Sequence, residues 1–168
     1  MVGAQRVANR FTSAEVVLQF FDGSFPAIPR ISFPFVAVCD VARAHILAME
    51  NFDKSNGNRY ICSEKTYPLK EVMGHLAELK SFGYKVPSSE MKYCMFSLAG
   101  LFKAEVKEIK PLWGRTIVCH HDKICEELGF EFTPVLPQIL NMAYECIKRG
   151  LIKDKTKGAA LERDNFAS

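Results

Sequence analysis

Clustered glycines are missing from this sequence. Its ten glycines are never closer than eight positions apart, so neither a GxGxxG nor a GxxGxxG turn can form. A dinucleotide pyrophosphate needs such a turn, because glycines let the backbone approach the phosphates and let the next helix pack closely on its strand. The 168 residues therefore contain no conventional nucleotide-binding turn.

A strong charge of one sign and a long apolar run are also missing. The 22 basic and 19 acidic side chains are spread over the sequence and leave a net charge of +3. This weak imbalance predicts neither a nucleic-acid partner nor an anionic membrane partner. No apolar run approaches the roughly 18 residues that span a bilayer, and the first residues do not resemble a secretion signal. We therefore expect a soluble, cytoplasmic protein.

Cysteine pairs of the CxxC type are absent as well. The six cysteines stand at positions 39, 62, 94, 119, 125 and 146. Their scattered places among apolar neighbours predict reduced and mostly buried thiols in place of disulfides. Cys119, His120, His121 and Cys125 are close enough in sequence to suggest a metal, but the spacing CHHxxxC is no common zinc pattern. We expect no metal, and we expect Asp122 to cap a helix instead.

Helical periodicity dominates what is present. The composition, 48% hydrophobic and 24% charged, is that of an ordinary globular domain. Apolar spacing and turn residues predict helices over residues 13–22, 40–51, 66–79, a long segment ending near 109, 122–128 and 134–149. They predict short strands over residues 31–38 and 59–63. Thr12 with Glu15, Asp40, Thr66 and Thr133 are the expected helix caps.

The helix expected over residues 40–51 is apolar nearly all the way round. Such a helix is typical of an internal element that packs on several sides. Asp40 and His45 could look like an acid and base pair. We expect instead that Asp40 caps this helix and that His45 is a buried histidine with a hydrogen-bond partner.

Three blocks of the sequence resemble, in the same order, one known family. They are FPFVAVCDVARAHILAME, GNRYICSEKTYPLKEV and DKICEELGFEFTPVLPQILNMAYECIKRGLI. The family is the extended short-chain dehydrogenase/reductase superfamily (NAD-dependent epimerase/dehydratase), in particular its branch similar to dihydroflavonol 4-reductase. The resemblance covers roughly residues 2–152. It implies an α/β fold, namely the C-terminal substrate-binding part of an extended Rossmann reductase, mostly helical with a few short strands. Residues 153–168 are polar and lack periodicity, which predicts a flexible tail.

The resemblance also implies site residues. Val2 and Gly3 fall where the family has a turn beside the cofactor, and Ser13 falls at a helix start on the cofactor's phosphate side, where free backbone amides favour an anion. Phe33, Pro34 and Phe35 fall where the family lines its substrate pocket, and their apolar walls suit a small organic carbonyl or alcohol. The alternatives are that Ser13 is only a polar first-turn residue and that the aromatic residues are core. Trp113 could roof a pocket on its size alone.

The family's catalytic tyrosine belongs to a YxxxK motif. The sequence has one such motif, Tyr144 with Lys148, but Tyr144 lies on the apolar stripe of the last helix and after the family's closing LGF block. We therefore assign no catalytic residue.

Two functions remain open. The chain is either the substrate-binding C-terminal portion of an NAD- or NADP-dependent oxidoreductase, or a non-catalytic binding module derived from one. In the first case the partner is the missing N-terminal half, and the chain alone is expected to be inactive and to bind the cofactor weakly.

Overall fold

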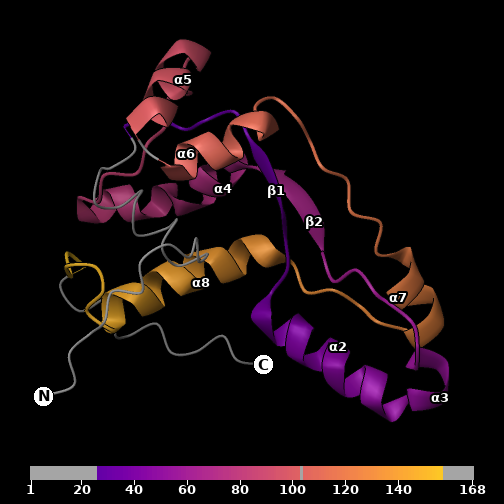
Figure 1. The fold of residues 1–168 in the computed structure, drawn as a ribbon. Coiled ribbons are helices and arrows are strands. Elements are labelled where there is room, and N and C mark those ends of the chain that lie inside the picture. Colours follow the sequence, from indigo (N-terminus) through magenta and orange to yellow (C-terminus); the bar gives the residue numbers. More distant parts are fainter. Residues whose placement is uncertain (1–25, 103, 157–168) are drawn as a thin grey trace, which may run out of the picture.

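The structure, a computed structural model, describes residues 26–102 and 104–156 (Figure 1). Its helices are α2 (Val38–Glu50), α3 (Phe52–Ser55), α4 (Leu69–His75), α5 (Tyr93–Phe102), α6 (Ala104–Ile109), α7 (Asp122–Leu128) and α8 (Val135–Lys148), with 3-10 helices η1 (Leu76–Phe82) and η2 (Lys110–Leu112). The strands are β1 (Ser32–Phe35) and β2 (Lys65–Pro68). The expected fold, mostly helical with a few short strands, is confirmed at this level. Val2, Gly3, Ser13 and the helix expected at 13–22 lie outside the described residues.

The two strands form an antiparallel pair, with Phe33 opposite Tyr67 and Phe35 opposite Lys65. The strand expected at 59–63 is wrong, because that segment has no neighbouring strand among the described residues and the pairing begins at Lys65. Thr66 is also not a helix cap. It lies inside β2, and its hydroxyl donates to the Ile117 carbonyl oxygen at 2.5 Å.

The largest core lies between the strand pair and three helical elements. In Figure 1 α8 runs alongside α4, and α8 contacts both α4 and η1. The apolar stripe expected on α8 faces this core, where Ile139, Ala143, Tyr144 and Ile147 are buried. The cap expected at Thr133 is wrong, because α8 begins only at Val135, after Pro134.

A second core joins α5 to α6. Phe96 and Val106 are buried there, with Trp113 packed against them. The long segment expected to end near 109 forms two helices, α5, which is described to Phe102, and α6, which is described from Ala104 to Ile109. Gly100 lies within α5, where an added Cβ would be 3.7 Å from the Lys107 backbone nitrogen, so α6 packs closely on this turn of α5.

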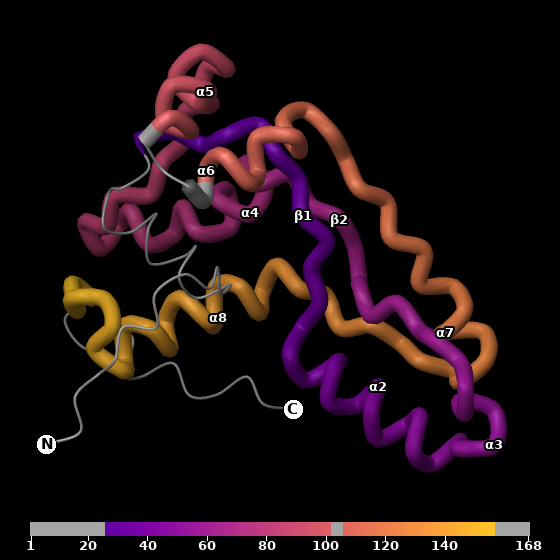
Figure 2. The backbone as a smooth tube through the Cα atoms, in the orientation of Figure 1, coloured from indigo at the N-terminus to yellow at the C-terminus, as the bar shows by residue number. Residues whose placement is uncertain are grey.

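A third core joins α2 to α7. It buries Ala44, Ile124, Leu128 and Phe130. α7 ends as expected at Gly129, which takes a left-handed φ of 65°. Asp122 opens this helix, but its side chain does not cap it, because His121 is the N-cap residue and no side-chain bond is made there. Figure 2 shows this unit of α2, α3 and α7 extending to the lower right, away from α4, α5 and α6.

The packing expected for α2 is wrong. On this helix only Asp40 and Ala44 are buried, and the opposite side is open. Val38, Ile46 and Met49 are exposed to 87%, 54% and 74%. An apolar helix is buried on several sides only when the segments that cover those sides are part of the same chain. We call the side that carries Val38, Ile46 and Met49 the open face of α2.

Three smaller expectations also change. The six cysteines are free, but only Cys146 is buried, so the thiols are not mostly buried. The Tyr84 hydroxyl donates to the Lys153 carbonyl oxygen and accepts from the Lys155 N–H, both at 2.9 Å, and Thr156 is buried. Residues 153–156 are therefore fixed against the body, and a loose tail does not begin at 153. Among the helices that the structure describes, none has the length and apolar character needed to cross a bilayer.

Candidate functional site

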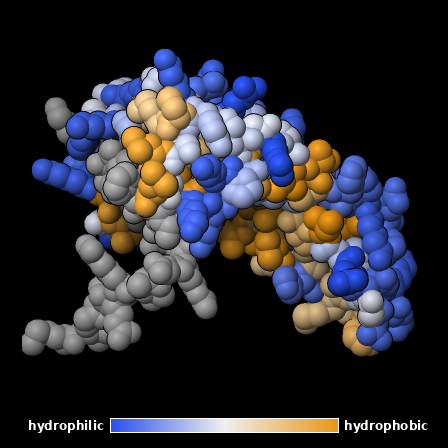
Figure 3. Space-filling view, turned by 45° about the horizontal axis from the view of Figure 1, so that its top comes forward, coloured by the Kyte–Doolittle hydropathy of each residue, from blue (hydrophilic) through white to orange (hydrophobic). Residues whose placement is uncertain are grey.

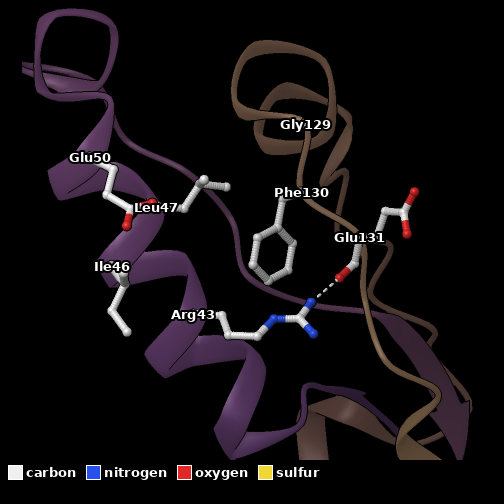
Figure 4. Close-up of a pocket in the computed structure, with 7 residues that line it drawn as sticks. All are labelled: Arg43, Ile46, Leu47, Glu50, Gly129, Phe130 and Glu131. Atoms are coloured by element: carbon white, nitrogen blue, oxygen red, sulfur yellow. Dashed lines mark hydrogen bonds between the residues drawn. The ribbon is translucent and has the colours of Figure 1, made fainter.

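A pocket of about 360 Å³ opens between α2 and the segment that connects α7 to α8 (Figure 4). Its lining residues come from two places that are far apart in the sequence. They are Arg43, Ile46, Leu47 and Glu50 from α2, and Gly129, Phe130 and Glu131 from the connecting segment. The two groups belong to two of the sequence blocks that carry the family resemblance, DVARAHILAME and LGFEF. The structure thus brings these blocks into contact.

Arg43 joins the two walls of the pocket. Its guanidinium donates to the Glu131 carbonyl oxygen at 2.5 Å and lies over the Phe130 ring, 5.1 Å from the ring centre. It is also 3.6 Å from the Asp40 carboxylate. In Figure 4 the Arg43 side chain reaches from α2 toward Glu131, beneath Phe130. A planar guanidinium can make these contacts together, because it donates in its plane and stacks with its face.

Asp40 lies behind Arg43 and is completely buried. Its carboxylate accepts hydrogen bonds from the Thr133 backbone N–H at 2.8 Å and from the Thr133 hydroxyl at 2.9 Å. The expectation that Asp40 caps α2 is therefore wrong. Ala37 is the N-cap residue, without a side-chain bond, and the Asp40 carboxylate serves a segment 93 residues further along the chain. Asp40 and Arg43 together hold the pocket walls at a fixed spacing.

The pocket lining combines apolar surface with a few charged groups. Ile46, Leu47 and Phe130 supply apolar surface, while Arg43 and Glu50 supply charges of both signs. The Glu131 side chain points away from the pocket in Figure 4. The lining contains no thiol, hydroxyl or imidazole, and the Glu50 carboxylate is a group there that could accept a proton. Apolar walls with a few polar groups are typical of sites for small organic molecules.

The residues expected to line a substrate pocket lie elsewhere. Phe33 and Phe35 are partly buried and pack against the largest core, and the Phe35 ring lies 6.3 Å from that of Tyr67. Pro34 is exposed on the other side of β1. None of the three lines the pocket beside Arg43. Their assignment as substrate-binding residues stays a prediction, and their surroundings are those of core and edge residues.

The tyrosine of the YxxxK motif points into the core, as the apolar stripe predicts. Tyr144 is 4% exposed, and its hydroxyl donates to Glu78 at 2.8 Å. The Lys148 ammonium lies 3.5 Å from the Glu145 carboxylate, one turn earlier on α8. Tyr144 is thus placed to support packing between α8 and η1.

The cysteine and histidine cluster is dispersed in space. Among the described residues no group of three or more histidine, cysteine, aspartate or glutamate side chains is close enough to hold a metal ion. His120 lies at the surface, 3.7 Å from Asp122, and the His121 ring contacts the Phe132 ring at a tilt of 49°, with ring centres 4.8 Å apart. Burial, with the Asp122 charge as a second cause, raises the pKa of the Cys125 thiol. A raised thiol pKa opposes metal binding.

His45 differs from its expected place. It is exposed on α2, and its Nδ1 lies 2.7 Å from the Val41 carbonyl oxygen. The hydrogen bond was expected, but the burial was not observed, because His45 lies on the open side of α2.

Comparison with known proteins gives a fold and no family. No protein-family model and no curated protein matches the sequence. Among solved structures, the chain is similar to the crystal structure of gox2253, with a TM-score of 0.62 at 20% sequence identity. The match covers 84% of this chain and 45% of the gox2253 chain, so this chain spans less than half of that protein's length. At this identity the likeness concerns the fold alone.

The sequence did not predict the pocket, although it contained a signal. Arg43 is a charged residue on a helix that is otherwise apolar nearly all round, and such a charge needs a partner when the helix packs. The partner proved to be the Phe130 ring and the Glu131 carbonyl. Nothing in the spacing of the sequence relates Arg43 to residues 88 positions away.

Proposed function

We propose that this chain is the substrate-binding, C-terminal portion of a cytoplasmic NAD- or NADP-dependent oxidoreductase that acts on an alcohol or carbonyl group. The nucleotide-binding turn and the catalytic tyrosine belong to a half that is not part of these 168 residues. Phe33, Pro34 and Phe35 are the substrate-side residues under this proposal. Under this proposal the assembled protein has the fold of an extended Rossmann reductase.

The observation that carries the proposal is the open face of α2. Val38, Ile46 and Met49 expose apolar surface on the side of the helix that faces away from α7. A contiguous apolar surface on a folded protein marks an interaction site, because water excludes such surface when a partner can cover it. The covering partner under this proposal is the nucleotide-binding half.

The backbone beside α2 supports the same partner. Residues 59–62 make no backbone hydrogen bond with another described residue, and Ile61 is exposed. Unpaired backbone groups in an extended segment favour pairing with a strand from elsewhere. Residues 59–62 belong to a sequence block for which the family resemblance implies a strand. The similarity to gox2253 agrees with a larger whole, since more than half of that chain has no counterpart here.

The first test uses the chain alone. The purified protein is titrated with NADH and NADPH, and nicotinamide fluorescence and turnover of simple aldehydes and alcohols are recorded. We expect no saturable binding and no turnover, because the glycine turn is absent. Tight cofactor binding with turnover by the verified, homogeneous chain would contradict the proposal.

The second test restores the missing half. The coding sequence directly upstream is inspected for an in-frame GxxGxxG and YxxxK, and the joined polypeptide is expressed. We expect the joined protein to bind the cofactor and to be active. We expect Ile46→Asp with Met49→Asp to prevent the two halves from packing together into a soluble protein. A matched control is Leu98→Asp with Leu101→Asp on α5, whose exposures of 58% and 76% equal those of Ile46 and Met49 closely.

Two results would decide against the proposal. Equal loss of assembly in the α2 and α5 variants would mean that the open face of α2 is not the interface. A joined protein that binds no cofactor would favour the alternative of a non-catalytic module.

A further inference from the structure

Helix α5 exposes a second apolar surface, distinct from the open face of α2. Its ten residues, YCMFSLAGLF, include no charged side chain. One side is buried through Phe96 against α6. The other side exposes Met95, Leu98 and Leu101, to 51%, 58% and 76%. We call these three residues the α5 patch.

The α5 patch stands at the opposite end of the molecule from α2. Figure 1 shows α5 at the top, projecting beyond α4 and α6, with α2 and α3 at the lower right. In the space-filling view, hydrophobic side chains gather at the upper left, where α5 lies, with hydrophilic ones above them (Figure 3). The surface is a projecting helix and not a groove. A projecting helix can insert into a lipid surface, whereas a bound peptide usually lies in a groove.

The net charge of the segment that contains α5 is positive. Residues 85–115 contain six lysines and arginines and three glutamates, an excess of three positive charges. The rest of the chain has sixteen basic and sixteen acidic side chains, so this segment accounts for the whole net charge of +3. Three of these cations adjoin α5. Lys92 directly precedes the helix and its carbonyl accepts from Phe96, Lys107 lies on α6 beside Gly100, and the Lys110 ammonium bonds the Ser97 hydroxyl at 2.9 Å.

The nearby negative charges do not cancel this excess. Glu90 is paired with Lys70 at 3.1 Å, which leaves the exposed Glu108 on α6 as the opposing charge among the side chains described there. The weak charge of the whole chain predicted no anionic partner. Its distribution shows a local positive excess in the segments next to an apolar patch.

Two aromatic rings lie at the base of α5. The half-exposed Tyr93 meets Trp113 edge to face, with ring centres 5.4 Å apart, and Trp113 also packs on Phe96 at 4.8 Å. Tyrosine and tryptophan favour the boundary between an apolar phase and water, because each ring has an apolar body and a polar group.

We propose that α5 docks this protein on an anionic lipid surface. Met95, Leu98 and Leu101 enter the headgroup and acyl boundary, and Lys92, Lys107 and Lys110 attract the negative headgroups. A peripheral helix binds in this way through buried apolar area and charge, without crossing the bilayer. A second copy of the chain is disfavoured as the occupant, since two α5 patches in contact would bring two segments of net positive charge together.

The test measures vesicle binding of the 168-residue chain by co-flotation. Vesicles of phosphatidylcholine with phosphatidylserine are compared with vesicles of phosphatidylcholine alone. We expect binding to the anionic vesicles, weaker binding to the neutral ones, and partial release when the ionic strength rises from about 0.1 M to about 0.5 M. The variant Leu98→Asn with Leu101→Asn is expected to lower the partition coefficient by about tenfold or more, since two leucines no longer enter the bilayer.

The matched control is Ile46→Asn with Met49→Asn, which changes equally exposed residues on α2. This variant should bind vesicles as strongly as the unchanged protein does. If the open face of α2 makes the unchanged protein self-associate, this variant serves as the reference protein for the α5 substitutions. Circular dichroism confirms that each variant is folded. Lys92→Gln with Lys107→Gln should reduce binding to the anionic vesicles alone.

Four outcomes would overturn the inference. They are absence of binding to anionic vesicles, equal binding to neutral ones, equal loss in the α2 control, and a dimer in light scattering that Leu98→Asn with Leu101→Asn abolishes. None of these outcomes bears on the nucleotide-binding half, because its interface is the open face of α2.

Discussion

The buried carboxylate of Asp40 accepts two hydrogen bonds from Thr133, one from the backbone N–H and one from the hydroxyl. This pairing connects the first turn of α2 to the chain that leads into α8. Hydrogen bonds to a charged acceptor are stronger than neutral ones, and a buried carboxylate needs all of its partners. We infer that this contact fixes the orientation of α2 and of its open face.

Asp40→Ala should therefore be strongly destabilising. It leaves the Thr133 N–H without its acceptor and removes the carboxylate beside Arg43. We expect the free energy of unfolding to fall by about 2–4 kcal/mol in urea denaturation. Asp53→Ala is the control, since Asp53 is exposed on α3 and should change stability by less than about 0.5 kcal/mol. Equal effects of the two variants would mean that the Asp40 contact is not a major determinant.

Tyr144→Phe should lower stability without affecting any reaction. The variant removes the hydroxyl that donates to Glu78, in a buried position between α8 and η1. The expected loss is about 1 kcal/mol, measured by thermal unfolding. Turnover of the assembled reductase under the proposed function should be unchanged, and a large loss of turnover at unchanged stability would place Tyr144 in catalysis.

Tyr67 should ionise at an unusually high pH, and the stability of the protein should depend on pH in the alkaline range. Burial, and next the hydrogen bond to Glu64, raise the pKa of Tyr67 from 10.0 to about 12. Because the folded protein holds the protonated phenol, this contribution to stability is present below pH 10 and is lost as the pH rises through about 12. Denaturation curves across this range, with phenolate absorbance, test the sign. Glu64→Gln removes the carboxylate charge that disfavours the phenolate, so Tyr67 should then ionise at a lower pH.

Two glycines should respond to alanine in opposite directions. Gly129→Ala forces a side chain into a left-handed φ of 65° with no steric contact within 4 Å, so backbone strain alone should cost about 1–2 kcal/mol. Gly100→Ala adds a methyl group inside α5 at ordinary contact distance from α6, and it should stabilise by about 0.5–1 kcal/mol. Thermal melts of the two variants compare the signs, and destabilisation by Gly100→Ala would show that α6 requires the glycine.

Most helices among the described residues were predictable from the sequence, because local periodicity determines them, but the side chains expected to cap their first turns were not the caps. The helix expected over 40–51 is α2, and Gly129 ends α7 where the sequence places the stop. The surroundings of these helices were less predictable. Asp40 was expected to serve its own helix, but its partner is Thr133, and no local rule relates residues 93 positions apart.

The errors in the sheet have the same origin. Residues 59–63 have the composition of a strand, yet the strand forms at Lys65–Pro68, where β1 offers an antiparallel partner. Strand formation depends on a neighbour as much as on composition. The pocket beside Arg43 was missed for a related reason, since its two walls meet only in the folded chain.

The Tyr84 hydroxyl, which both donates to Lys153 and accepts from Lys155, sets a practical limit on shortening the protein. A version cut after Ile152 would remove both of these hydrogen bonds from the buried Tyr84 hydroxyl. Anyone trimming this polypeptide for crystallisation or for fusion to another domain should retain the residues through Thr156, and place any added linker beyond that point.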